Sequence, residues 1–181
     1  MRAQTTLDFA IGMSFFLLAV AFVFAFVPGM IDPFTGSTQE EMTASNRLAD
    51  RLATDALASP DEPTVLNETC TRRFFDTSAA PGTCAFAADN GDGPGDRLEV
   101  DDRLSVNATI TGDADDDGNG GLLCWDDAAA SVAEESSGNC GDSADVTFAG
   151  GDAPPDGQSV VSATRRVTIG DTDARLVVRA W

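Results

Sequence analysis

The sequence predicts an α+β protein, in which a long N-terminal hydrophobic helix, kinked near Pro28, is followed by a β-rich, sandwich-like globular head. Three observations predict this fold. An uncharged apolar run extends from Phe9 to Val27. A second stretch, from about 37 to 58, repeats its apolar residues at a helical period. From Thr64 onward the apolar period changes towards two, which is typical of strands.

The apolar run is long enough to cross a membrane once. As a helix, its roughly nineteen residues rise about 1.5 Å each and cover nearly the whole hydrocarbon thickness of a bilayer. We expect a continuous helix from Gln4 to Val27. Pro28-Gly29 follows directly and is expected to break or kink this helix at the far membrane face.

The chain is expected to contain four parts. Residues 1–3 form a short positive segment, 4–31 the hydrophobic helix, 32–60 an amphipathic continuation, and 61–181 the head. The amphipathic helix has a capping box, because Thr38 is followed three residues later by Glu41. Ser59-Pro60 is expected to end it.

The head is expected to be built from strands separated by Gly, Asp, Asn and Pro clusters. The last two candidates flank the turn Gly170-Asp171-Thr172-Asp173 and should pair as an antiparallel hairpin. The stretches 88–96, 112–121, 134–143 and 150–157 are predicted loops. The candidate strands are Thr64–Phe75, Thr83–Ala87, Arg97–Val100, Arg103–Ile110, Leu122–Trp125, Val146–Ala149, Ser159–Ile169 and Ala174–Trp181.

The charge is strongly acidic. Thirty acids stand against eleven bases, for a formal net charge of -19, and every base is Arg. Such a surface excludes nucleic-acid binding. Strong acidity without Lys is similar to the proteins of salt-loving archaea, whose carboxylates keep the surface hydrated, and the alternative is an ordinary acidic protein. At about 1 M salt the Debye length is about 3 Å, so this self-repulsion would be largely screened.

Four cysteines follow the apolar run as two local pairs, Cys70 with Cys84 and Cys124 with Cys140. This spacing favours two small disulfide loops, although three connectivities are formally possible. Each disulfide would contribute about 3 kcal/mol, and both imply an oxidising, extracytoplasmic compartment. A zinc site is the competing interpretation, but the chain has no histidine and no Cys-x-x-Cys spacing.

Two N-glycosylation sequons begin at Asn67 and Asn107, in the part of the chain that would be exported. They agree with export without proving it, since a three-residue sequon often arises by chance.

The first residues resemble a known type of signal. Arg2-Ala3 is followed by Gln4-Thr5-Thr6-Leu7-Asp8-Phe9 and then by the apolar run. This pattern resembles the class III signal peptide of archaeal type IV pilin-like proteins, and the acidic composition points to the haloarchaeal ones. By this resemblance, residues 1–3 are the leader, and a prepilin peptidase would cut between Ala3 and Gln4.

The resemblance also assigns an assembly role to the stem. Gln4 and Asp8 would take the roles that these positions hold in pilins. When helices pack side by side, Asp8 of one subunit would meet the Gln4 α-amine of a neighbour and set the axial register, because an uncompensated charge in a dry bundle is costly. The alternative is that Asp8 simply suits the positive end of the helix dipole.

The head has one candidate cation site. Asp113, Asp115 and Asp117 precede Gly118 in an Asp-x-Asp-x-Asp-Gly start like that of calcium-binding loops. The closing acid is missing, and Asp126 and Asp127 are the nearby candidates to substitute for it. The alternative is a solvated loop with no ion, so the chain is expected to need no cofactor other than this candidate Ca²⁺.

No catalytic constellation is visible, because the chain has no His, no Lys and no phosphate-binding Gly-rich loop. An enzyme is therefore not expected, and the resemblance of the stem implies a subunit, major or minor, of an archaeal type IV pilus-like surface filament for adhesion or cell-surface interaction. Its partners would be copies of itself or other pilins, with the membrane, N-terminus cytoplasmic, before assembly. The alternative is a single-pass anchored surface protein whose head binds a ligand or cation and which does not polymerise.

Overall fold

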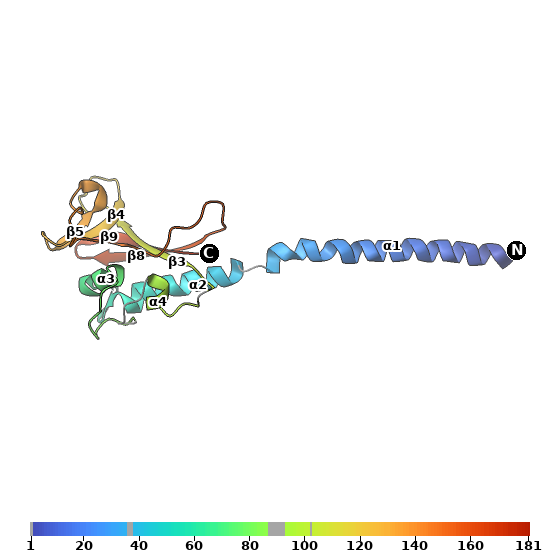
Figure 1. The fold of residues 1–181 in the computed structure, drawn as a ribbon, viewed down its shortest axis with the longest axis horizontal. Helices are drawn as coiled ribbons and strands as arrows, with labels where there is room; N and C mark the ends of the chain where they lie inside the picture. The colour runs from blue at the N-terminus through green and yellow to red at the C-terminus, as the bar shows by residue number, and fades with distance from the viewer. Residues whose placement is uncertain (1, 36–37, 87–92, 102) are drawn as a thin grey trace. The chain divides into compact units, whose positions relative to one another are not determined.

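A computed structural model describes residues 2–35, 38–86, 93–101 and 103–181. The chain divides into two compact units, Met1–Ser37 and Thr38–Trp181 (Figure 1). This boundary falls inside the predicted 32–60 segment. The amphipathic helix therefore packs within the second unit.

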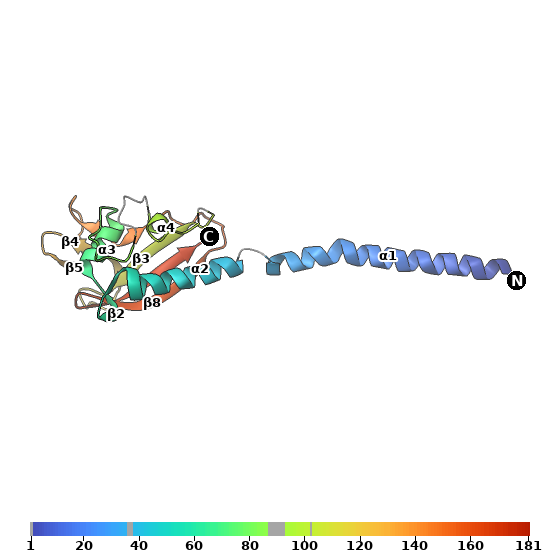
Figure 2. The ribbon, with the colours of Figure 1, turned by 90° about the horizontal axis from the view of Figure 1, so that it is seen from below.

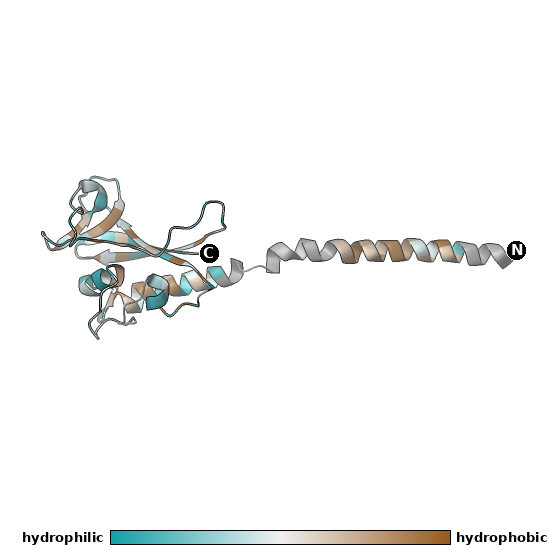
Figure 3. Cartoon of the chain, viewed as in Figure 1, coloured by the Kyte–Doolittle hydropathy of each residue, from teal (hydrophilic) through white to brown (hydrophobic). Residues whose placement is uncertain are grey.

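The first unit is a single helix, α1, which spans Arg2–Thr35 and whose side chains are described for residues 8–25. Phe9, Phe15 and Phe24 are 69%, 72% and 75% exposed, and they point to different sides of the helix because each residue turns it by about 100°. Hydrophobic residues predominate along this whole stretch (Figure 3). The predicted hydrophobic helix is confirmed.

The helix ends later than predicted. Pro28 and Pro33 both lie within α1, which continues to Thr35. A proline removes one N–H from the helical ladder, but its fixed φ is compatible with a helix. The prediction of a boundary at Val27 assumed that the residue pair Pro28-Gly29 ends the helix. In the structure this pair does not end it.

The second unit begins with α2, Thr38–Arg51, which continues directly into a π-helical turn, η1, Leu52–Ala56. The backbone N–H of Leu57 donates to the carbonyl of Leu52, five residues earlier, at 3.1 Å. The predicted amphipathic helix is confirmed, and its apolar face packs on strands β8 and β9. Its buried side chains are Leu48, Ala49, Leu52, Ala53, Ala56 and Leu57.

The described strands form one sheet with the order β1-β2-β8-β9-β3-β4-β5, in which β6 pairs with β4 and β7 pairs with β3. The predicted C-terminal hairpin is confirmed, because β8 and β9 pair antiparallel from Val161↔Ala180 to Ile169↔Thr172. Gly170 begins its turn with a φ of 57°, a value that favours glycine. The strands are β1 Ala58–Ser59, β2 Glu62–Leu66, β3 Val106–Gly112, β4 Gly121–Asp126, β5 Ser131–Glu134, β6 Val146–Thr147, β7 Ala149–Gly150, β8 Val161–Ile169 and β9 Thr172–Ala180.

Helices cover one face of this sheet. α2, α3 (Glu68–Phe75) and α4 (Pro94–Arg97) lie on the same side of the strands in two perpendicular views (Figures 1 and 2). The buried residues of β8 and β9 alternate along each strand, and α2 packs on both strands. The head is therefore mixed α+β, and the layer that packs on this face is helical. A short 3₁₀ turn, η2 (Glu135–Ser137), follows β5.

Three predicted strands are wrong. Thr64–Phe75 was expected as one strand, but β2 ends at Leu66 and α3 begins at Glu68. The Asn67 side chain caps α3 by accepting from the backbone N–H of Cys70 at 3.0 Å. Arg97, the first residue of the predicted strand Arg97–Val100, is instead the last residue of the short helix α4, which starts at a proline. No strand forms over residues 83–86, and residue 87 lies outside the described part of the chain.

The remaining differences in the head are smaller. β5, Ser131–Glu134, was not predicted, and its last residue was placed in a loop. The predicted strand Val146–Ala149 is split into β6 and β7, which pair with different partners, β4 and β3. The chain therefore passes from one partner strand to another between Thr147 and Ala149.

Both predicted disulfides are present. Cys70 bonds Cys84 with Cα atoms 5.5 Å apart, and Cys124 bonds Cys140 with Cα atoms 6.3 Å apart. No cysteine in the chain is left free. The first disulfide joins α3 to the following loop, and the second joins β4 to the segment after η2.

A buried arginine secures the first disulfide loop. Arg97 is 0% exposed, and its guanidinium donates to the carbonyls of Arg73 at 2.8 Å and Ser78 at 3.0 Å. It also lies over the Phe86 ring, 5.5 Å from its centroid. Desolvation lowers the pKa of Arg97, and the nearby Asp76 charge raises it by less.

Candidate functional site

The stem carries the strongest functional signal in the first unit. The stretch Asp8–Ala25 is long and apolar enough to cross a membrane, and none of it is buried within the structure. Asp8 is the single charged residue of this stretch and is exposed. The Ser14 hydroxyl donates to the carbonyl of Ala10 at 2.8 Å, so this polar group is satisfied within the helix.

Four residues singled out in the stem lie outside the described side chains. The backbones of Ala3, Gln4, Pro28 and Gly29 belong to α1. Because nothing beyond their backbone is described, leader cleavage, the register contact and the kink stay predictions.

The predicted cation site lies in the loop between β3 and β4. The carboxylate oxygens of Asp113, Asp115 and Asp117 all lie within 4.8 Å of one another. Backbone N–H groups shape the loop around them, since Asp117 donates to Asp113 at 3.0 Å and Gly118 donates to Asp113 at 2.8 Å. The paired ends of the two strands, at Gly112 and Gly121, close the loop. The three acids predicted to act together are therefore adjacent.

The proposed closing acids lie elsewhere. The Asp127 carboxylate pairs with Arg72 at 2.9 Å, and Asp126 accepts from the backbone N–H of Ala129 at 2.9 Å. Glu134 of β5 takes their place beside the loop. It is 4% exposed, and its carboxylate accepts from the backbone N–H of Ala114 at 2.8 Å. Sequence reasoning missed Glu134 because strand pairing, not sequence spacing, brings it to the loop.

The acids in this loop repel one another. The pKa of the Asp115 carboxyl is raised above its usual value. The hydrogen bond from the Asp117 backbone lowers it, but desolvation and three neighbouring carboxylates together raise it by more, those of Asp117, Glu134 and Asp113. A hard cation would relieve this repulsion, because it prefers clustered carboxylate oxygens.

The two sequons have different surroundings. The Asn107 side chain is 8% exposed, and its Nδ2 donates to the carbonyls of Gly150 at 3.1 Å and Gly151 at 3.2 Å. A glycan on this nitrogen would replace one of its two N–H donors and would have to leave a buried site. Asn67 is half-buried, and the described contact of its side chain uses Oδ1 and leaves out Nδ2. The folded head therefore favours Asn67 over Asn107 as an acceptor.

Together these features define a class of protein in which one exposed apolar helix of membrane-spanning length precedes an acidic, disulfide-bonded α+β head. The chain belongs to DUF7287, a family of unknown function, whose model matches residues 1–181. Neither the curated proteins nor the solved structures contain a match to the chain.

Proposed function

We propose that this protein is a structural subunit, a major or minor pilin, of an archaeal type IV pilus-like surface filament. It polymerises through α1 and presents the head for adhesion or cell-surface interaction. Before assembly the stem lies in the membrane with its N-terminus cytoplasmic. A prepilin peptidase removes residues 1–3.

One observation carries this proposal. Residues 8–25 of α1 are apolar on all sides and exposed, while the head is a separate compact unit with its own core. A helix that is apolar all round needs partners on every side, which lipid supplies before assembly and neighbouring helices supply afterwards. The pilin-like residues Gln4 and Asp8 at its start favour the filament over lipid alone.

Asp8 would set the stagger of the filament. In a dry bundle, its carboxylate needs a cationic partner, and the α-amine of the cut Gln4 in a neighbouring copy is suited to this. Only one axial offset between copies pairs the two groups. The predicted kink near Pro28 belongs to the same proposal, since it would let the stem bend where it leaves the bundle, and the sandwich-like packing of the head likewise stays a prediction.

The test replaces Asp8 in the full chain. Asp8→Ala leaves the α-amine unpaired, and breaking a buried pair in this way costs about 3–5 kcal/mol. We expect incorporation into sheared surface filaments to fall by more than about tenfold, measured by electron microscopy and mass spectrometry. The same spectra should show a mature N-terminus at Gln4.

Two controls accompany this variant. Asp8→Glu keeps the charge and should still assemble, while Asp55→Ala removes an exposed acid of η1 and should assemble like the parent chain. Normal incorporation of Asp8→Ala contradicts the register role. An intact Met1 in recovered protein contradicts the pilin assignment as a whole, and a Gln4 that has lost ammonia excludes the ion pair.

A second candidate function is favoured by the β3–β4 loop. Three adjacent carboxylates beside the buried Glu134 suit a head that binds a cation. The protein would then be a single-pass anchored surface protein that never polymerises. Monomers in detergent, with no filaments in sheared fractions, would favour this second function.

A further inference from the structure

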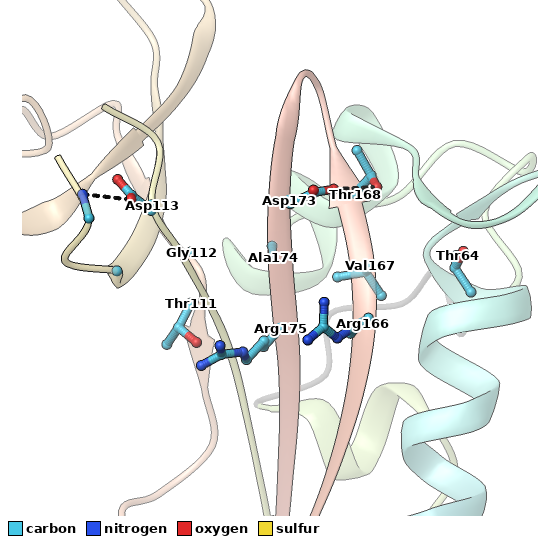
Figure 4. A pocket seen from close by; sticks show the side chains of 12 residues that line it. Thr64, Thr111, Gly112, Asp113, Arg166, Val167, Thr168, Asp173, Ala174 and Arg175 are labelled. Atoms are coloured by element: carbon cyan, nitrogen blue, oxygen red, sulfur yellow. Dashed lines mark hydrogen bonds between the residues drawn. The ribbon is translucent and has the colours of Figure 1, made fainter. Parts of the chain in front are cut away.

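Two arginines face each other across the central hairpin of the head. Arg166 of β8 and Arg175 of β9 are directly opposite in register, and both are exposed. Thr111 of β3 is the partner of Arg175 on its other side. Figure 4 shows the two guanidinium groups at the same level of the hairpin, beside Thr111.

Neither arginine has a partner among the described residues. Four other arginines form ion pairs with carboxylates: Arg72, Arg73, Arg103 and Arg165. Three more donate to carbonyl, amide or hydroxyl oxygens: Arg51, Arg97 and Arg179. Arg47 of α2 also lacks a described partner, but among the described arginines only Arg166 and Arg175 both lack a partner and lie directly opposite each other on paired strands.

This arrangement is unfavourable without a ligand. Like charges placed directly opposite on neighbouring strands destabilise a sheet. Because acids are abundant in this chain, either arginine could easily have had an acid opposite it. A bound anion would remove the repulsion, and the planar guanidinium fork matches the geometry of carboxylate and phosphate oxygens.

The two arginines line a hollow of about 460 Å³, large enough for a small oxyanion with several waters. Its rim includes Thr64, whose φ of 70° is unusual for a β-branched residue. Strained backbone of this kind clusters at binding sites. Thr64 and Thr111 also line the hollow, and their hydroxyls can act as neutral donors to a ligand.

Two acids also line the hollow, and both have other partners. Asp113 accepts from the backbone N–H groups of Asp117 and Gly118 at 3.0 and 2.8 Å, so its carboxylate is engaged by its own loop. Asp173 accepts from the Thr168 hydroxyl at 3.3 Å. Neither forms an ion pair with the two arginines within the described residues.

We propose that Arg166 and Arg175, with Thr64 and Thr111 at the rim, form a binding site for an oxyanion of the carboxylate or phosphate type. The site lies on the sheet of the head and does not depend on whether the stem polymerises. Its ligand is either a free oxyanion or an acidic side chain of a second copy of this chain.

The test follows the arginine side-chain Nε–Hε signals by NMR, in the full chain in detergent micelles at constant ionic strength. Inorganic phosphate is the probe, with chloride replaced stepwise. We expect saturable shifts of the Arg166 and Arg175 signals. Arg47, an exposed arginine of α2 without a described partner, should not shift in a saturable way.

Matched variants distinguish phosphate binding at this site from a general effect of net charge. Arg166→Gln with Arg175→Gln should weaken phosphate binding at least tenfold. Without phosphate, this double variant should be as stable as the parent or more stable, because the like-charge contact is gone. Arg47→Gln, which makes a single charge change on α2, should leave phosphate binding unchanged.

A dilution series distinguishes the two sources of the ligand. If the arginine signals shift with protein concentration and phosphate reverses that shift, an acidic group of a second copy occupies the site. If phosphate saturates the site with no dependence on protein concentration, the ligand is a free oxyanion. Signals that respond to neither, or equal phosphate affinity in the double variant, overturn the proposal.

Discussion

An ion pair joins the first helix of the head to its central hairpin. The guanidinium of Arg165 in β8 donates from Nε to the Asp50 carboxylate of α2 at 2.6 Å, and its Nη2 donates to the Asn46 side chain at 3.2 Å. The hydrogen bond from Arg165 lowers the pKa of Asp50, although desolvation opposes it. Arg165 thus points to the helix side of the sheet, whereas its neighbour Arg166 points to the opposite side.

The pH dependence of stability should reveal this pair. A carboxyl whose pKa is lower in the folded than in the unfolded state contributes stability above its unfolded pKa, about 3.9, and loses it as the pH falls through the folded value. Asp50→Asn should therefore lower Tm at pH 7. The difference from the parent chain should shrink progressively below about pH 4, as measured by circular dichroism.

The control for this prediction is Asp55→Asn, which removes an exposed acid of η1 that forms no described ion pair. Its Tm should stay close to that of the parent chain at pH 7. Because the Asp50–Arg165 pair is partly exposed, high salt should also reduce the effect of Asp50→Asn. A constant difference in Tm between pH 7 and pH 2 would falsify the role of the pair.

Among the elements, the β3–β4 loop holds several carboxylates close together, and their like charges repel one another. One carboxylate oxygen from each of its three acids lies within 4.8 Å of the others. The hydrogen bond from the Asp117 backbone lowers the pKa of Asp115, but desolvation and the neighbouring carboxylates together raise it by more. A group with a raised pKa favours folding below its unfolded pKa and loses that contribution as the pH rises through the folded value. At neutral pH the bare loop therefore weakens the head, and a divalent cation would strengthen it.

Calcium should raise the Tm of the full chain. At about a hundredfold excess over Kd, a ligand bound only by the folded state adds about 2.7 kcal/mol. Asp115→Asn with Asp117→Asn should raise the Tm of the calcium-free chain and abolish the calcium effect. Protons compete for the same carboxylates, so the calcium effect in the parent chain should also shrink at acidic pH.

Glu134→Gln tests the buried acid separately. This variant should show a weaker calcium effect if the Glu134 carboxylate helps to bind the ion. Asp156→Asn, at an exposed position of another loop, is the matched control and should respond to calcium like the parent. Isothermal titration with no heat in the parent chain would rule out the cation site.

The elements also differ in how far the sequence predicts them. β8 and β9 were predicted because alternating apolar residues flank a Gly-Asp turn, and α2 because its apolar residues recur at a helical period. α3 was missed because the strand pattern that begins at Val65 and Leu66 was extended to Phe75. The boundary depends on the cap at Asn67 and on burial of Phe74 and Phe75 in the core, which sequence period alone does not report.

For the whole molecule, charge is the dominant physical property. The net charge is -19, and the described residues form only four ion pairs that offset the repulsion between like charges. Self-repulsion acts between many carboxylates across the surface, whereas partly exposed ion pairs each contribute at most about 1 kcal/mol. Screening by salt should therefore stabilise the head more than it weakens these pairs.

The expected result is a Tm that rises from about 0.1 M to about 1 M KCl, where the Debye length falls from about 10 to 3 Å. Circular dichroism measures it, with NaCl as the second chloride salt to separate screening from an effect of the cation. The rise should level off once the charges are screened. A Tm that falls with KCl would show that the ion pairs outweigh the repulsion.

The candidate sites show the same limit of prediction at this scale. The sequence places Asp113, Asp115 and Asp117 together, because their spacing is local. It does not reveal Glu134, because the pairing of β5 with β4 brings this residue to the loop. It predicts the hairpin that holds Arg166 and Arg175, but the strand register that places them directly opposite each other is seen only in the structure. Both disulfides were predicted for the same reason as the acidic loop, since their partners are close in sequence.

The position of β9 has a consequence for the timing of folding. This last strand lies between β8 and β3, and Arg179 of β9 bonds Asn107 of β3, 72 residues earlier in the chain. The centre of the sheet is therefore incomplete until β9 has been synthesised. Contacts between distant segments form slowly, so the sheet of the head should form later than the helix α1, whose contacts are local.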